Sequence, residues 1–208
     1  MSRTETLTPA HRLWARHHPE PDPIAMKTLG FWLYMLSDAL IFAGLFAAYA
    51  VLDHKFNAAG GPQIKNVVHP LEAFVQTIVV FTSVLAYSLA MVGLKARNRM
   101  FVLAGLLSAF VLGGVFLGLE INDFATLVAH GITPERSGLM SIFFVLIATH
   151  GLHMAFGMLW MAVMMAQVAL KGFTTEVVTR LLNLRLFWVF QASIWVCMFV
   201  FVYLNGAF

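Results

Sequence analysis

Apolar residues run in five long stretches separated by short polar segments, and this pattern predicts the architecture of the chain. Each stretch has about 20 residues or more, the length a helix needs to cross a ~30 Å hydrocarbon core at 1.5 Å per residue. No stretch shows the alternation expected of a barrel strand. We therefore predict an all-α membrane protein, a bundle of five transmembrane helices, with spans at approximately residues 28–52, 70–94, 100–121, 139–170 and 184–205.

Composition agrees with this pattern, since 60% of the 208 residues are hydrophobic and 11% are charged. In a soluble domain the net charge of +3 would suggest a nucleic-acid partner. Here the cations lie in short segments beside the spans, where they report orientation, so we expect no nucleic-acid partner. The single cysteine, Cys197, excludes an intrachain disulfide and a thiolate metal centre.

The distribution of basic residues predicts how the bundle lies in the membrane. Ten of the 13 Lys and Arg residues fall in the polar tail, residues 1–27, and in the second and fourth loops. The positive-inside rule places these segments in the cytoplasm, and an odd number of crossings then puts the C-terminus in the periplasm. We predict a cytoplasmic tail over 1–27, without a cleaved signal, followed by a transmembrane domain over 28–208.

Small residues spaced four apart indicate where helices pack closely. Gly114 and Gly118 have this spacing in the third span, and Gly44 with Ala48 has it in the first. Such pairs let neighbouring backbones approach one another. Small residues are also common in membrane helices generally, so a specific packing role competes with a neutral one.

Ionisable residues within the spans are the candidate functional groups, because each is costly in hydrocarbon. Asp38 lies ~15 Å into the first span, and His150 and His153 enter the fourth span to a similar depth from the other side. Matched depth makes Asp38 the candidate partner of these imidazoles. Glu120 and Asp123 lie at the predicted outer end of the third span, where we expect interfacial carboxylates that reach water.

The two histidines could serve a cofactor, a proton path or contacts between helices. Residues three apart share one helix face, so His150 and His153 cannot ligate the two sides of one haem. Two imidazoles without a third ligand also make half a metal site at most. We therefore predict that this chain binds no metal and no haem, which leaves hydrogen bonding between helices and participation in a proton path as open alternatives.

Four sequence motifs resemble a known family. They are "GFWLYMLSDALIFAGLFAAYAV" (30–51), "NAAGGP" (57–62), "GLEINDF" (118–124) and "RSGLMSIFFVLIATHGLHMAFGMLWM" (136–161). They resemble subunit III of the haem–copper terminal oxidases, in particular the five-helix form found in bo-type ubiquinol oxidases. The resemblance covers essentially the whole chain after residue 27.

The resemblance implies a non-catalytic subunit of a proton-pumping quinol oxidase in the bacterial inner membrane. Its partners would be subunits I, II and IV, with the haems and copper in subunit I and phospholipid in a cleft between helices. Its roles would be assembly, stability and lipid binding. Asp38 would be the family's buried acid, and His150 and His153 its H-G-x-H pair.

One departure leaves alternatives open. The last helix of the family usually carries a histidine and an acid where this chain has Val189 and Ala192. Their joint loss is expected of an interacting pair, because either group alone would be unpaired in the membrane. The alternatives are an accessory protein of a nitric oxide reductase, a subunit of a cytochrome c oxidase, a haem-bearing membrane anchor and, disfavoured by the odd helix count, a small transporter.

Overall fold

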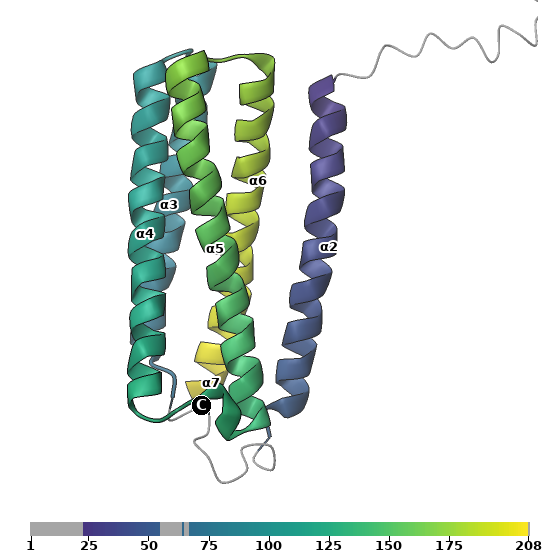
Figure 1. Ribbon diagram of the computed structural model, residues 1–208, viewed down its shortest axis with the longest axis vertical. Coiled ribbons are helices and arrows are strands. Elements are labelled where there is room, and N and C mark those ends of the chain that lie inside the picture. The colour runs from purple at the N-terminus through teal and green to yellow at the C-terminus, as the bar shows by residue number, and fades with distance from the viewer. Residues whose placement is uncertain (1–22, 55–63, 65–66, 208) are drawn as a thin grey trace, which may run out of the picture.

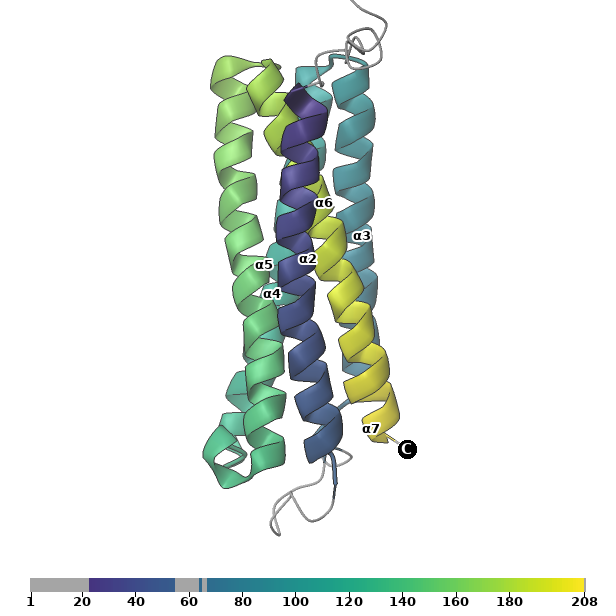
Figure 2. The same cartoon turned by 90° about the vertical axis from the view of Figure 1, so that its right-hand side faces the viewer.

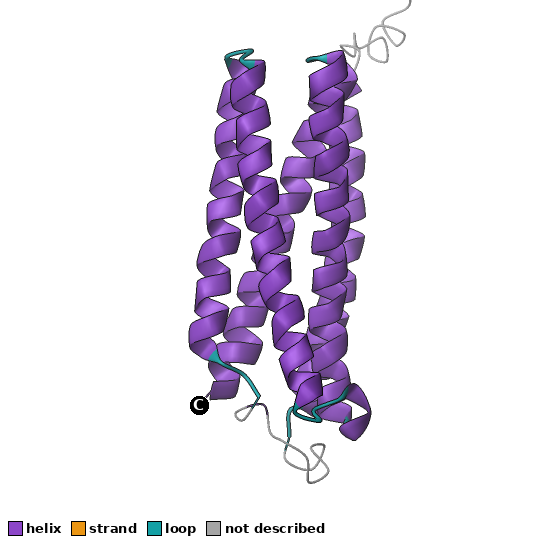
Figure 3. Ribbon diagram, turned by 60° about the vertical axis from the view of Figure 1, so that its left-hand side comes forward, coloured by secondary structure: helices purple, strands orange, loops and turns teal. Residues whose placement is uncertain are grey.

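The computed structural model describes residues 23–54, 64 and 67–207. Helices account for nearly all of this part of the chain, and no strand occurs within it (Figure 3). The predicted tail, 1–27, lies outside the described residues except for 23–27, which begin the first helix.

Five long helices form the bundle, and each is long and apolar enough to cross a membrane. They are α2 (Pro23–Leu52), α3 (Pro70–Lys95), α4 (Arg99–Ala129), α5 (Gly138–Lys171) and α6 (Thr175–Met198). A 3₁₀ turn, η3 (Pro134–Arg136), precedes α5, and a π-helical segment, η4 (Phe199–Leu204), continues α6 into the short α7 (Asn205–Ala207). The prediction of an all-α bundle with five membrane-spanning helices is confirmed.

Two helices extend well beyond their predicted bounds. Helix α4 continues past residue 121 to Ala129 and is followed by Gly131, whose φ of 73° is the left-handed conformation that glycine favours. Helix α6 begins at Thr175 instead of residue 184, because the Thr174 hydroxyl caps its start by accepting a hydrogen bond from Val177 N. Capping groups, rather than the fall in hydropathy, set these ends.

Helix α2 lies along one side of a group made by the other four helices (Figures 1 and 2). Consecutive helices from α3 to α6 pack against each other, while α2 contacts α5 and α6. The chain enters α2 at one end of the bundle and finishes α7 at the opposite end (Figure 1). The bundle therefore has a central group of four helices and one peripheral helix.

Tryptophan side chains of α6 tie it to α3 through hydrogen bonds. Trp188 Nε1 donates to Ser83 Oγ at 2.9 Å, and Ser83 in turn donates to the Ala109 carbonyl of α4 at 3.0 Å. Trp195 Nε1 donates to Thr77 Oγ1, also at 2.9 Å. Because hydrocarbon offers no competing partner, such bonds align helices that apolar packing alone would let rotate.

Three glycines allow close contact between helices. A Cβ on Gly105 would lie 2.7 Å from Ala90 Cβ on α3, and one on Gly113 would lie 2.9 Å from the Trp188 ring. On α5, a Cβ on Gly157 would lie 2.7 Å from the Phe187 ring. These positions require glycine because a backbone or an aromatic ring occupies the adjacent space.

The glycines that their spacing predicted to be packing positions are not the three that the structure shows in close contact. A Cβ on Gly44 or Gly118 would meet nothing within 4 Å, and one on Gly114 would only touch Met158 Cε at 3.4 Å. The predicted role of Gly44 and Gly118 in packing within the chain is therefore wrong. Four-residue spacing identifies a shared helix face but does not say whether that face points into the bundle.

Substitution of these glycines separates the two groups. We expect Gly105→Ala to lower the stability of the protein by about 1–3 kcal/mol, because the added methyl group must push α3 away from α4. Its matched control on the same helix, Gly118→Ala, should change stability by less than about 1 kcal/mol. Thermal unfolding of the two variants in detergent measures both effects, and equal melting temperatures would contradict the tight α3–α4 contact.

Candidate functional site

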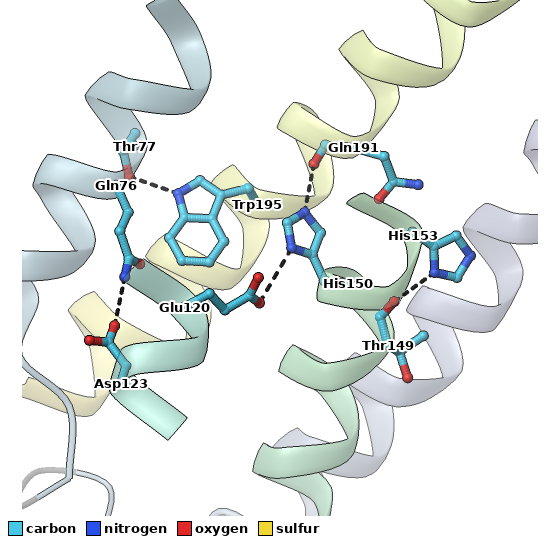
Figure 4. Close-up of polar contacts among 9 residues, drawn as sticks. All are labelled: Gln76, Thr77, Glu120, Asp123, Thr149, His150, His153, Gln191 and Trp195. Carbon is cyan, nitrogen blue, oxygen red and sulfur yellow. Dashed lines mark hydrogen bonds and ion pairs between the residues drawn. The ribbon is translucent and has the colours of Figure 1, made fainter. Parts of the chain in front are cut away.

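Each of the five long helices places a buried polar side chain in the interior of the bundle. These are Asp38 of α2, Gln76 of α3, Glu120 of α4, His150 of α5 and Gln191 of α6, and none is more than 4% exposed. Figure 4 shows His150 between Glu120 and Gln191, while Gln76 lies apart from them beside Asp123. Polar groups so deep in an apolar bundle are costly, so their contacts define the candidate site.

Asp38 and His153 form a hydrogen-bonded pair that joins α2 to α5. His153 Nε2 lies 3.1 Å from Asp38 Oδ1, and His153 Nδ1 lies 2.7 Å from the Thr149 carbonyl oxygen. A carbonyl only accepts, so Nδ1 carries a proton and donates to it. The Nε2–Oδ1 contact then needs one further proton, held by the acid or by the ring. In either form the pair is neutral overall.

His150 and Glu120 form a second pair by the same reasoning. His150 Nε2 lies 3.2 Å from the Gln191 carbonyl oxygen and must donate to it. Its other nitrogen, Nδ1, lies 3.8 Å from Glu120 Oε1, which is longer than a hydrogen bond. A buried carboxylate is costly unless it is protonated or faces a cation, so we infer that one proton belongs to this pair as well. It too is neutral overall and holds one transferable proton.

Glu120 differs from its predicted position at the membrane interface. Because α4 continues to Ala129, Glu120 lies about 13 Å before the end of the helix and is 3% exposed. Gly151 makes room for it, since a Cβ there would lie 3.1 Å from Glu120 Oε2. The expectation of an interfacial carboxylate at Glu120 is therefore wrong, and the glycine of "HGLH" packs directly against this acid.

Asp123 lies one helical turn further along α4. It is partly exposed, and its Oδ2 accepts a hydrogen bond of 2.6 Å from Gln76 Nε2 (Figure 4). Asp123 also lines a pocket at the end of the bundle where α4 terminates. The two acids predicted together as interfacial thus have different surroundings, one in the interior and one beside a pocket.

Several buried polar residues were not predicted as site residues. Gln76 and Gln191 are neutral amides, whereas the buried polar residues predicted from the sequence are all ionisable. Both amide atoms of Gln191 are buried and lack a hydrogen-bond partner among the described residues. An amide within an apolar span is itself an unusual signal, and it would have pointed to both residues.

Within residues 23–54, 64 and 67–207, no three His, Cys, Asp or Glu side chains are grouped so that they could hold a metal ion. Cys197 is a free, partly exposed thiol. The chemistry that the arrangement does support is the holding and transfer of protons at the two acid–imidazole pairs.

Variants of Asp38 test the first pair. Asp38→Ala leaves His153 Nε2 without its partner, and we expect a loss of about 1–3 kcal/mol in stability. Asp38→Asn should lose less, because the amide can donate to Nε2 of a neutral ring while Nδ1 keeps its bond to Thr149. The neighbouring exposed Ser37, whose hydroxyl bonds only locally to the Tyr34 carbonyl, supplies the control Ser37→Ala. Thermal unfolding in detergent compares them, and an Asp38→Ala protein as stable as the control would contradict the pairing.

Comparison with known proteins places this arrangement in a family. Residues 17–207 match the family model described as cytochrome c oxidase subunit III. The chain is 41% identical over 201 residues to a cytochrome bo(3) ubiquinol oxidase subunit 3 of Pseudomonas aeruginosa, which covers 97% of this chain and 95% of the relative. It is 41% identical over 181 residues to the protein of that name from Pseudomonas putida, covering 87% and 86%. A cytochrome c oxidase subunit 3 of Bacillus sp. is 35% identical over 182 residues, covering 86% of each. The chain therefore belongs to the cytochrome c oxidase subunit III family.

Proposed function

We propose that this chain is the non-catalytic subunit III of a haem–copper ubiquinol oxidase in the bacterial inner membrane. The observation that carries the proposal is the 41% identity, over 97% of the chain, to a relative named as subunit 3 of such an oxidase. Five apolar helices long enough to cross a bilayer support the membrane location. The complex would oxidise ubiquinol and reduce oxygen in aerobic respiration, while this chain supports its assembly and stability.

The partners in this proposal are subunits I, II and IV of the oxidase. Subunit I would hold the haems and copper. Large apolar side chains on α2 support contacts with other subunits or with lipid, since Leu29, Leu33 and Leu40 are all more than half exposed. The distribution of Lys and Arg supports a cytoplasmic N-terminus and a periplasmic C-terminus.

Purification from the native membrane tests this assignment. We expect the affinity-tagged chain to bring down a subunit with a low-spin haem and a haem–copper centre, and the complex to oxidise ubiquinol. Recovery without a haem–copper subunit would contradict the proposal, and recovery with a nitric oxide reductase would favour that alternative. The chain separated from its partners should show no haem Soret band, whereas such a band would favour the haem-bearing anchor.

Two apolar grooves beside α2 support a lipid-binding role. One, with a volume of about 460 Å³, lies between α2 and the α5–α6 pair and is lined by Phe31, Tyr34, Phe156, Leu159, Trp160, Val163 and Phe187. The second, of about 450 Å³, lies between α2 and the end of the last membrane span and includes Phe46 and Phe201. Both could hold acyl chains of phospholipid, because their walls are almost wholly hydrocarbon and aromatic.

A larger side chain in one groove tests whether phospholipid binds there. We expect Val163→Trp to reduce the phospholipid that co-purifies with the complex by about one molecule, because the indole occupies space that an acyl chain would fill. The matched control is Leu152→Trp, at a position of the same helix that is 71% exposed and outside both grooves. Lipid phosphorus and native mass spectrometry give the count, and equal lipid content in the two variants would contradict binding in this groove.

A further inference from the structure

A pocket opens at the end of the bundle where α3 begins and α4 ends. Its volume is about 150 Å³, and its titratable lining groups are His69, Glu72, Asp123 and Tyr203. His69 and Glu72 are exposed. A site needs only about 10–15 Å³ of such space to hold one water molecule, so this pocket has room for several.

A smaller pocket continues from the first one into the bundle. The two share Asp123, Leu127, Phe143 and Tyr203 in their linings, and the inner pocket adds Glu120. Its volume of about 10 Å³ is at the lower limit of the space that holds a single water. Glu120, Asp123 and Tyr203 supply the polar groups that such a water needs.

The innermost groups of this series lack partners. Both carboxyl oxygens of Glu120 and Nδ1 of His150 are buried without a hydrogen-bond partner among the described residues. The Glu120 carboxyl group is aimed at His150 Nδ1 across a gap of 3.8 Å (Figure 4). That gap is too long for a direct hydrogen bond, so both groups keep bonding capacity that a water in the inner pocket beside Glu120 can use.

The local backbone shapes this series of groups. The π-helical segment η4 changes the helical register beyond Met198 and places Tyr203 in the lining of both pockets. Gly151 of α5 has no side chain, and this leaves the space that the Glu120 carboxyl group of α4 occupies. Beyond His150, the hydrogen bond from Nε2 ends at the Gln191 carbonyl, which accepts a hydrogen bond but has no proton to pass on.

We propose that the two pockets form a hydrated inlet from the bundle end that carries His69 and Glu72 to the Glu120–His150 pair, so that the shared proton of this pair exchanges with the aqueous phase. The inlet ends at the Gln191 carbonyl and therefore gives access from one side only. Water and protons are its ligands. This inference rests on the geometry of the chain and does not depend on the proposed oxidase function.

Infrared spectroscopy of the purified complex in H₂O and D₂O tests the inlet. The shared proton gives an infrared band of the group that carries it. This band is the C=O stretch of a protonated Glu120 or a ring mode of a His150 imidazolium. Difference spectra against Glu120→Gln and His150→Gln assign these bands. We expect the assigned band to shift as fast as the medium exchanges, well ahead of the buried backbone amides.

Blocking the inlet should slow the shift. Leu127 lines both pockets, and we expect Leu127→Trp to slow the exchange roughly tenfold by displacing the water of the inner pocket. The matched control, Val128→Trp, changes the next residue, which is 51% exposed and lines neither pocket, and should exchange like the unmodified protein. Tyr203→Phe, which keeps the ring and removes only the hydroxyl group, provides a milder variant and should slow the exchange several-fold.

Three results would overturn the proposal. The first is an assigned band that exchanges as slowly as the buried amides, which would mean a sealed pair. The second is equal exchange in Leu127→Trp and Val128→Trp. The third is exchange in Tyr203→Phe that is as fast as in the unmodified protein, and it decides the matter if the Leu127→Trp variant does not assemble.

Discussion

The neutral Asp38–His153 pair is the contact on which the position of α2 depends. Apolar contact between membrane helices gains little over contact with lipid, so packing alone holds a peripheral helix weakly. In an apolar stretch of 18 residues, 22% is buried in α2, against 50% in the span formed by α6 and η4. A hydrogen bond of 3.1 Å in this setting supplies direction as well as attraction, and the bond to the Thr149 carbonyl fixes the orientation of the His153 ring. The depth and rotation of α2 beside α5, and with them the two grooves, follow from this pair.

Hydrogen bonds also position the central helices of the bundle, but here the donors are neutral side chains. Trp188 and Trp195 of α6 find hydroxyl partners on α3, and Tyr87 of α3 donates to the Leu181 carbonyl of α6 at 2.9 Å. These bonds lock the central helices, while the acid–imidazole pairs lie beside them and keep groups without partners. The distinction separates structural polar residues, whose bonding is complete, from the Glu120–His150 pair, whose bonding is not. Glu120 of this pair also lines the inner pocket.

Hydropathy predicted the number and approximate positions of the spans because each one is a long run of apolar residues. The matched depth of Asp38 and His153 was also readable, since depth depends only on the distance along a helix. Glu120 was misplaced because the polar "EIND" resembles the end of a span, although the backbone continues as a helix to Ala129. The facing residues, such as Gly105 with Ala90, could not be predicted, because a helix that is apolar all round carries no signal of its rotation about its own axis.

The substitutions at Val189 and Ala192 follow from the same balance of charges. Val189 is 40% exposed, so the family's histidine at this position would point out of the chain, whereas Ala192 is 4% exposed and an acid there would be buried. The interior holds two imidazoles, His150 and His153, and each already has a carboxyl partner. An acid at residue 192 would therefore need the histidine at 189 as its own partner, because both of these imidazoles are already paired. With valine at 189 and alanine at 192 both members of that pair are absent, and neither is left as an unpaired polar group.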